Sequence, residues 1–186
     1  MLTFHSKILY KKALICLVSL SLLSVRCDFL KIDDPKPELP PITITGENTF
    51  GAIVNGKISL NNDVIGLRAV NQNSSILDIG ASFIDRSRGI DQSIFFVIRD
   101  DNLSVGQYEL MVYQDLARVA SFRNFESKCY YDYRLNENTR YTGTLNILKL
   151  DDVNRIVSGT FEFTISVDGC PDVQVEQGRF DLKLIN

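Results

Sequence analysis

Residues 159–167 read GTFEFTISV, and this stretch decides the fold class. Its apolar residues recur at every second position: Phe161, Phe163, Ile165 and Val167. The polar residues between them point the other way, which is the pattern of a β-strand with one buried and one solvated face. Residues 179–184 repeat the alternation, so we expect both stretches to be strands of an antiparallel sheet.

The alternation also predicts the two faces of these closing strands, which we expect to be antiparallel neighbours. The inner face would hold Phe161, Phe163, Ile165, Phe180, Leu182 and Leu184. The face toward water would hold Glu162, Arg179, Asp181 and Lys183. We expect residues 168–178 to form the connecting loop, because Pro171 has no N–H to donate to a strand ladder.

Other stretches extend the pattern upstream. Residues 77–83 alternate, whereas residues 94–98 (IFFVI) are apolar throughout and predict a strand covered on both faces. Asn55-Gly56 separates two short apolar runs and predicts a two-residue hairpin, because both positions tolerate a positive φ. A short helix is expected, if anywhere, at residues 115–125.

Clusters of turn-forming residues separate these runs at intervals typical of a sandwich or barrel of short strands. They lie at residues 61–63, 71–75, 86–89, 100–102, 136–138, 151–154 and 168–171. With 186 residues, 45% of them hydrophobic and 23% charged, the chain has the composition of a globular protein. We predict an all-β fold, a single antiparallel β-sandwich domain at residues 42–186.

The N-terminus predicts export. Lys7, Lys11 and Lys12 precede the apolar run ALICLVSLSLLSV at residues 13–25, which is too short to span a bilayer. A basic region followed by a short apolar run is typical of a secretory signal peptide, which we place at residues 1–26. A buried core helix and a single-pass membrane anchor are the alternatives.

Cys27 stands directly after this run, where bacterial lipoproteins carry the cysteine that is acylated on sulfur. Residues 23–26 (LSVR) are similar to a lipobox, although Arg26 stands where a small residue is usual and Ser24 where Leu is usual. We predict that Cys27 is lipidated. Cleavage nearby that leaves Cys27 as a plain thiol is the alternative.

Residues 28–41 (DFLKIDDPKPELPP) predict a spacer behind this cysteine. Four of the five prolines in the chain lie here, and proline density favours extended polyproline II at about 3.1 Å per residue. We therefore predict a lipid-anchored, Pro-rich tether over residues 27–41. A disordered linker without a spacing role is the alternative.

Charge and histidine content exclude several classes of function. The chain has 20 basic and 23 acidic residues, and four of the basic ones precede Cys27, so residues 27–186 carry a formal charge of −7. A nucleic-acid binder needs a cationic surface, and we predict no nucleic-acid partner. The only histidine, His5, lies in the signal, which excludes His-dependent catalytic and metal sites from the mature chain.

Two cysteines remain once Cys16 leaves with the signal and Cys27 is acylated. In an oxidising compartment Cys129 and Cys170 most simply form one disulfide. The closed loop of about 40 residues would stabilise the fold by about 3–4 kcal/mol in the chain-entropy model. A zinc site would need about four ligands, so we predict no metal site.

Residues 46–57 (GENTFGAIVNGK) resemble the opening of a group of small, uncharacterised Bacteroidota lipoproteins, whose domains begin with a tether, a TG.NTFG segment and a VNGK turn. Residues 156–163 (IVSGTFEF) and 178–181 (GRFD) are similar to the strands that close the same domains. Members often have Cys where this chain has Ala52, so any disulfide at that position is absent here. The resemblance implies a lipoprotein with a β-sandwich, and it implies no activity.

The carboxylates do not predict an active site. Nearly all of a set of eight lie at strand ends beside Gly or Asn, where Asp favours turns: Asp85, Asp91, Asp100, Asp101, Asp151, Asp152, Asp168 and Asp172. A glycosidase would need two of them across a cleft, and a structural Ca²⁺ would need several of their oxygens. We predict no catalytic residue and no cofactor.

Tyr130, Tyr131, Tyr133 and Tyr141 form the densest aromatic group, within residues 128–141 (KCYYDYRLNENTRY). Tyrosines with Asn and Arg nearby can stack on and hydrogen-bond a sugar or a peptide, so these four are candidate ligand-binding residues. The alternative is that Tyr131 and Tyr133 fill a sheet face and the other two tyrosines pack at its rim. The absence of Trp from the chain also counts against a glycan platform.

Together these observations predict a non-catalytic lipoprotein of the cell envelope, held at the outer membrane by its lipid anchor and acting as an interaction or accessory module. Its partner would be a protein or a glycan. A carbohydrate- or peptide-binding domain that uses the tyrosine-rich segment 130–141 is the first alternative. A hydrolase that depends on carboxylates alone is the second.

Overall fold

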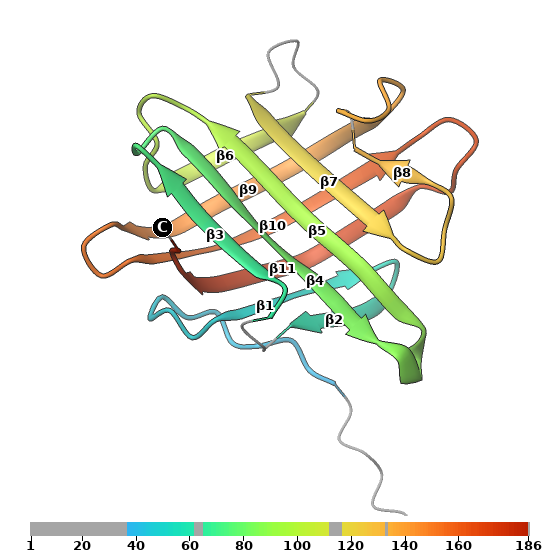
Figure 1. The fold of residues 1–186 in the computed structure, drawn as a ribbon, viewed down its shortest axis with the longest axis horizontal. Helices are drawn as coiled ribbons and strands as arrows, with labels where there is room; N and C mark the ends of the chain where they lie inside the picture. Colours follow the sequence, from blue (N-terminus) through green and yellow to red (C-terminus); the bar gives the residue numbers. More distant parts are fainter. Residues whose placement is uncertain (1–36, 62–64, 112–116, 133, 186) are drawn as a thin grey trace, which may run out of the picture. The chain divides into compact units, whose positions relative to one another are not determined.

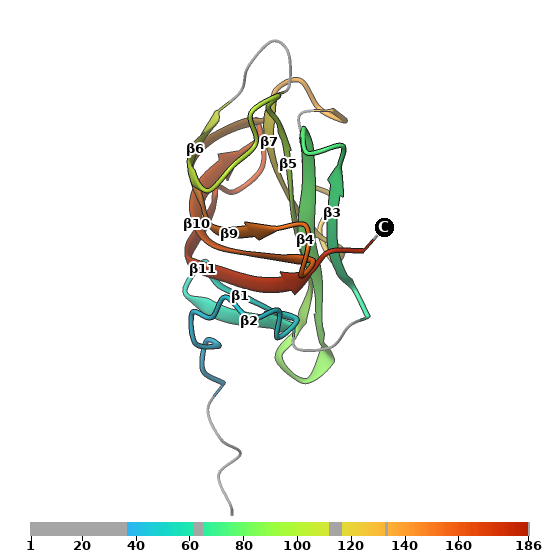
Figure 2. The ribbon, with the colours of Figure 1, turned by 90° about the vertical axis from the view of Figure 1, so that its left-hand side faces the viewer.

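The computed structural model describes residues 37–61, 65–111, 117–132 and 134–185. Two antiparallel sheets lie face to face around one apolar core, so the predicted all-β sandwich is confirmed (Figure 1). The strands of the two sheets cross in Figure 1, and the side view in Figure 2 shows the two layers. The outer faces of the sheets are therefore the two broad surfaces of the domain.

Each sheet consists of antiparallel neighbours. The six-stranded sheet contains, in spatial order, β2 (Lys57–Asn61), β1 (Thr49–Val54), β11 (Val173–Lys183), β10 (Ile156–Ser166), β9 (Arg140–Asp151) and β6 (Gly106–Met111). The five-stranded sheet contains β3 (Leu67–Gln72), β4 (Ile76–Asp85), β5 (Ile90–Arg99), β7 (Arg118–Asn124) and β8 (Tyr130–Tyr131). The first and last strands, β1 and β11, are adjacent.

β10 and β11 are antiparallel neighbours, as the alternation predicts. All six residues of the predicted inner face are buried: Phe161, Phe163, Ile165, Phe180, Leu182 and Leu184. The predicted connection at residues 168–178 is too long, because β11 already begins at Val173. Val173 and Val175 are buried in the core, so the alternation that defines the strand starts earlier than predicted.

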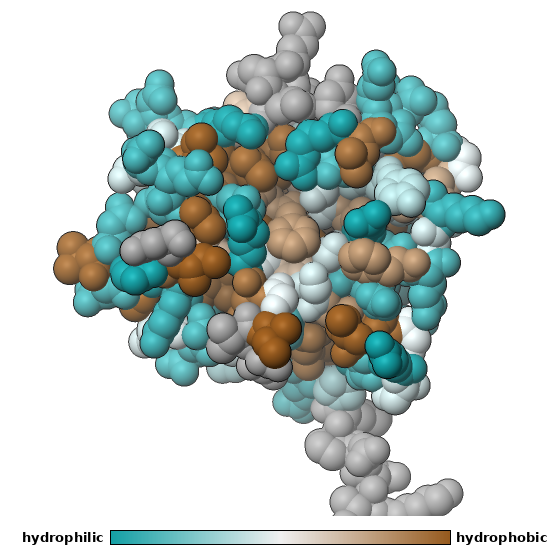
Figure 3. Space-filling model, in the orientation of Figure 1, coloured by the Kyte–Doolittle hydropathy of each residue, from teal (hydrophilic) through white to brown (hydrophobic). Residues whose placement is uncertain are grey.

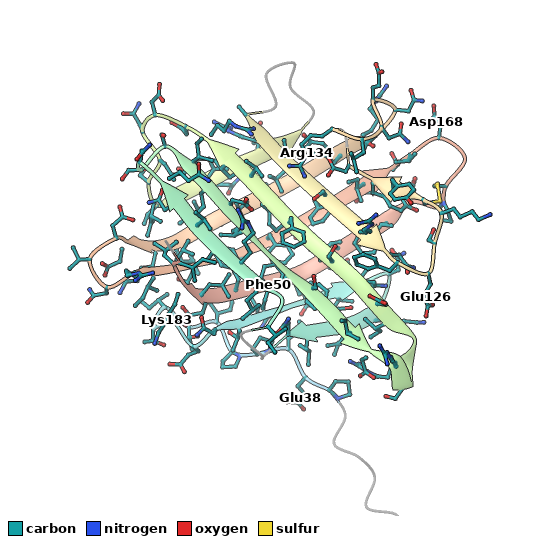
Figure 4. The ribbon with its side chains drawn as sticks, in the orientation of Figure 1. Glu38, Phe50, Glu126, Arg134, Asp168 and Lys183 are labelled. Atoms are coloured by element: carbon teal, nitrogen blue, oxygen red, sulfur yellow. A yellow bond between two sulfur atoms is a disulfide. The ribbon has the colours of Figure 1, made fainter. Side chains whose placement is uncertain are left out.

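Six phenylalanines from both sheets meet in the core. Each is at most 3% exposed: Phe50, Phe83, Phe96, Phe161, Phe163 and Phe180. The ring centre of Phe161 on β10 lies 4.9 Å from that of Phe96 on β5 and 5.2 Å from that of Phe50 on β1. Such contacts add about 0.5–1.5 kcal/mol per pair beyond area burial. The cluster therefore joins the two sheets. Phe50, one of its members, is labelled in Figure 4.

The predicted hairpin at Asn55-Gly56 is present and joins β1 to β2. Both residues have a positive φ, 47° for Asn55 and 77° for Gly56, as a two-residue turn that follows the twist of its strands requires. The Asn55 side chain also accepts a hydrogen bond of 2.8 Å from the Gln174 N–H. The turn therefore fixes the hairpin to β11.

The stretch at residues 115–125, the one place where the sequence leaves room for a short helix, holds a strand in its described part. Residues Arg118–Asn124 form β7, which pairs with β5. Ala120 and Phe122 belong to the core cluster, whereas Ser121 between them lines the opposite face, so the segment has the period of a strand. Pairing with β5 decides the conformation here, because local propensity is weak compared with tertiary packing.

The compact unit of the fold begins at Pro37, five residues before the predicted boundary at Ile42. Pro40 is buried and lies over β1, where a Cβ atom on Gly51 would be 2.9 Å from the Pro40 side chain. The last part of the predicted tether therefore packs on the domain, because Gly51 leaves space for a proline ring.

The predicted signal at residues 1–26, the lipidation site Cys27 and the first part of the tether lie outside the described residues. Within the described ranges, no helix is long and apolar enough to cross a membrane. Secretion and lipidation therefore stay predictions from the sequence.

Candidate functional site

The structure separates the tyrosines of the predicted binding segment. Tyr130 on β8 is 48% exposed, whereas Tyr131 and Tyr141 are buried in the core. The Tyr131 hydroxyl donates to the Pro171 carbonyl at 2.6 Å, and the Tyr141 hydroxyl donates to a carbonyl of β7 at 3.2 Å. Tyr133 lies outside the described residues. The three described tyrosines thus do not form an exposed row. Tyr131 is buried as the alternative interpretation expects, whereas Tyr141 is buried in the core and not packed at the rim.

The predicted disulfide between Cys129 and Cys170 is confirmed, with the two Cα atoms 6.0 Å apart. Cys129 precedes β8, and Cys170 lies in the turn between β10 and β11. The bond therefore ties the edge of the five-stranded sheet to the six-stranded sheet. The hydrogen bond from Tyr131 to Pro171 lies directly beside this link.

A groove of about 200 Å³ opens on the outer face of the five-stranded sheet, and we call it the sheet groove. Its main lining residues come from β5, β7 and the segment that follows β7: Ser93, Phe95, Ser121, Arg123, Tyr130 and Arg134. Figure 3 looks onto this face and shows apolar and hydrophilic residues interspersed over it. The predicted segment 130–141 therefore supplies one wall of a groove, although not through all of its tyrosines.

Phe95 forms the floor of the sheet groove. Its neighbours Ile94 and Phe96 point into the core, so the alternation of β5 places Phe95 on the outer face. Gly80 on β4 is directly opposite Phe95, and a Cβ atom at Gly80 would overlap Cδ1 of the Phe95 ring. The ring therefore lies across Gly80, close to the sheet, and its other side faces the groove.

Two arginines flank this floor, and only one has its charge compensated. Nε and Nη2 of Arg134 donate to the Asp132 carboxylate at 2.9 and 2.7 Å, which raises the pKa of the Arg134 guanidinium above its ordinary value. The Arg123 guanidinium lies 4.8 Å from the ring centre of Phe125 and 5.3 Å from that of Tyr130. It forms no ion pair with a carboxylate of the described residues. Figure 4 shows Arg134 over the five-stranded sheet.

The prediction that β5 is covered on both faces is wrong at Phe95. Residues 94–98 predict a strand covered on both faces, whereas Phe95 is only half-buried and lines the groove. Neither Phe95 nor Gly80 is among the site residues predicted from the sequence. Their signal is a large apolar residue opposite a glycine on the neighbouring strand, and it becomes visible only when the register of β4 and β5 is known.

A second site holds the segment that enters the domain. The Asp181 carboxylate on β11 accepts hydrogen bonds from the N–H groups of Thr45 (2.9 Å), Gly46 (2.8 Å) and Glu47 (3.3 Å) and from the Thr43 hydroxyl (2.7 Å). Gly46 has a φ of 79°, and a turn of this kind lets successive N–H groups converge on one anion. We call Asp181 together with residues 43–47 the Asp181 clasp.

The prediction that Asp181 faces water is wrong, since its residue is only 1% exposed. Asp181 does lie on the outer face of its sheet, but residues 43–47 cover that face. Burial raises the pKa of the carboxyl, and the hydrogen bonds from the clasp outweigh burial, so the pKa lies below its ordinary value of 3.8. Glu162 and Lys183 are exposed as predicted, and Arg179 is half-buried.

The two motifs that carry the resemblance to lipoproteins meet at this clasp. Asn48 accepts a hydrogen bond of 3.0 Å from the Lys183 N–H through its side chain, and Phe50 pairs with Phe180 across β1 and β11. Residues 46–51 and 178–181 therefore build one substructure. Its role is to fix the entering segment on the six-stranded sheet.

Asp85 and Asp151, which belong to the set of eight carboxylates, stabilise their own turns, as the sequence predicts. Asp85 caps a 3-10 helical turn by accepting from the N–H groups of Ser87 and Arg88, and Asp151 accepts from the N–H of Asn154 at 2.8 Å. Hydrogen bonds from Ser87 and Arg88 lower the pKa of Asp85 to about 2. Among the residues that the structure describes, no group of three or more His, Cys, Asp and Glu side chains is placed to hold a metal ion.

Comparison with known proteins identifies no relative. No family model matches this chain, and no curated protein or solved structure is similar to it.

Proposed function

We propose that this chain is a non-catalytic lipoprotein of the outer membrane, in which a lipid on Cys27 anchors a β-sandwich that acts as an interaction module. The Asp181 clasp carries the proposal. It attaches the segment that follows the tether to β11, which has strands on both sides in the six-stranded sheet. A domain held by its N-terminus needs such an attachment, because tension on the tether then acts on a central strand and not on a fraying end.

The positions of the clasp and the groove support this role. Asp181 lies on the outer face of the six-stranded sheet, and Phe95 lies on the outer face of the five-stranded sheet. In Figure 2 the entering segment, in blue, runs beside β1 and β2 in one layer, while β3, β4 and β5 form the other. The domain would thus be held through one face and would bind through the opposite face.

The proposed spacer is shorter than residues 27–41. The compact unit begins at Pro37, which leaves residues 28–36 between the domain and Cys27. At about 3.1 Å per residue in polyproline II, this length reaches about 30 Å. The anchored domain would therefore work close to the membrane surface.

A carbohydrate- or peptide-binding domain is the second candidate function. The observation that favours it is that Tyr130 and Arg134, both from the tyrosine-rich segment, line the sheet groove. The two candidates are compatible, because a tethered module can bind such a ligand in the groove.

Cell fractionation tests the anchor. We expect the wild-type chain and the Cys16→Ala variant to sediment with the membranes, and the Cys27→Ala variant to appear in the soluble fraction. Cys16→Ala is the matched control, because Cys16 lies inside the predicted signal. Mass spectrometry of the wild-type protein should find Cys27 acylated at the N-terminus. Membrane-bound Cys27→Ala protein, or a mature N-terminus elsewhere, would reject the anchor.

A further inference from the structure

The sheet groove has an aromatic floor with hydroxyl groups beside it. Ser121 is directly opposite Phe95 on β7, and Ser93 precedes Phe95 by two residues on the same face of β5. Ser82 on β4 is opposite Ser93 and also lines the groove. Each serine hydroxyl can donate one hydrogen bond and accept two. The Ser121 hydroxyl already donates to the Phe95 carbonyl at 3.3 Å, so toward a ligand it can act as an acceptor. The floor therefore matches a ligand with an apolar face and several hydroxyl groups at its edge.

A pyranose ring has this distribution of chemistry. Its C–H bonds form an apolar face that can lie on the electron-rich face of Phe95, and its hydroxyls project sideways toward hydrogen-bonding partners. The groove volume of about 200 Å³ is below the 300–1,000 Å³ typical of sites for drug-sized ligands. A single ring of a longer saccharide therefore fits the groove better than a whole extended ligand does.

Arg123 adds a charge requirement. The rings of Phe125 and Tyr130 hold its guanidinium at the wall of the groove, while no carboxylate of the described residues pairs with it. The charge of Arg134 is already compensated by Asp132. A guanidinium binds a carboxylate through two parallel hydrogen bonds, so Arg123 favours a ligand that carries an acidic group.

We propose that the sheet groove binds one acidic sugar residue of a saccharide, with the pyranose ring on Phe95 and the carboxylate on Arg123. This inference rests on the proposed role as an interaction module and names the ligand class of that module. It does not depend on the lipidation of Cys27.

A peptide partner fits the groove less well. An apolar side chain from a partner protein gains most when it fills a deep, fully desolvated pocket. Here the floor is the sheet itself, and two of the surrounding side chains, Phe125 and Tyr130, are about half exposed. An apolar side chain would also offer no hydrogen-bond partner to the hydroxyls of Ser82 and Ser93, at a cost in binding free energy.

Isothermal titration calorimetry of the full chain in detergent tests the proposal. The probes are trigalacturonate, an acidic trisaccharide, and maltotriose, a neutral trisaccharide with the same type of linkage. We expect trigalacturonate to bind and maltotriose to bind at least about tenfold more weakly, because the neutral sugar lacks the charge-assisted contact with Arg123.

Three variants locate the site. Arg123→Gln should weaken trigalacturonate binding by about tenfold or more, and Phe95→Leu should weaken it as well, because it removes the ring while keeping an apolar side chain. Arg86→Gln is the matched control, since it removes the same charge from an exposed arginine outside the groove. The control should stay within about twofold of wild type, and circular dichroism should show that each variant is folded.

Several results would overturn the proposal. Folded wild-type protein that binds neither trisaccharide rejects it, as does Arg123→Gln protein that binds trigalacturonate as tightly as wild type. Equal affinity for the two sugars rejects the acidic group. Binding of the acetylated peptide Asp-Phe-Asp, lost in Arg123→Gln and without sugar binding, would assign the groove to a protein partner instead. Each failure is distinct from failure of the anchor, which the Cys27 fractionation reports separately.

Discussion

Gly46 and Asp181 are 135 residues apart in the sequence and are joined by a hydrogen bond of 2.8 Å from the Gly46 N–H to Oδ1 of Asp181. The contact brings the turn at residues 43–47 onto the last strand, next to the pairing of β1 with β11. Three consecutive N–H groups and the hydroxyls of Thr43 and Thr45 share the same carboxylate. The conformation of the entering segment therefore depends on one charged group near the far end of the chain.

Replacing Asp181 by Asn should destabilise the domain by about 2–4 kcal/mol at pH 7, because the amide loses the charge and turns donors toward the donors of the clasp. Urea unfolding of wild type and variant at the same pH measures this difference. Glu162→Gln, on an exposed residue of β10, is the control for removal of one negative charge.

The difference in unfolding free energy between wild type and Asp181→Asn should depend on pH. The pKa of Asp181 is lower in the folded state than the value of about 3.9 in an unfolded chain, so its contribution to stability is complete above that unfolded pKa. It is lost as the pH falls through the folded pKa. The difference in unfolding free energy between wild type and Asp181→Asn should thus shrink below about pH 4. A difference that stays constant from pH 7 to 2 would contradict the role of the charged carboxylate.

Replacing single side chains of β10 and β11 by Ala should distinguish core positions from surface positions. Phe163→Ala and Phe180→Ala each remove a buried ring of the phenylalanine cluster and should cost about 3–5 kcal/mol. Glu162→Ala and Lys183→Ala alter exposed side chains on the same strands and should change stability by about 0.5 kcal/mol or less. Thermal melting of the four variants, each in full-length Cys27→Ala protein, measures these stability losses. Equal small losses at all four positions would mean that the two faces are assigned wrongly.

Loss of the disulfide should lower the free energy of unfolding, because the unfolded chain is then no longer constrained by the closed loop. The Cys129→Ser/Cys170→Ser double variant should lose about 3–4 kcal/mol relative to the oxidised wild type, because 41 residues of sequence separate the two cysteines. A reducing agent should bring the wild type to the same stability and leave the double variant unchanged. Alkylation of both cysteines in the native, unreduced protein would rule out the bond.

Local features of the sequence were sufficient to predict the closing strands, one hairpin and the disulfide. The period of two in residues 159–167 and 179–184 identifies β10 and β11 and their inner faces, because alternation along a strand is a property of the backbone itself. Asn55-Gly56 identifies a hairpin, because few residues adopt two successive positive φ angles. The pairing of Cys129 with Cys170 followed from elimination in an oxidising compartment.

The sequence by itself thus determined which side chains share a face, and only the tertiary structure decided what covers each face. The position of Asp181 in the alternation of β11 predicts a solvated side chain, yet residues 43–47 bury it. Phe95 belongs to a run that predicts burial, yet its outer side lines a groove because Gly80 lies opposite. Alternation is set by neighbours in the chain, whereas burial is set by segments that arrive from far away, and the period of a strand holds no information about them.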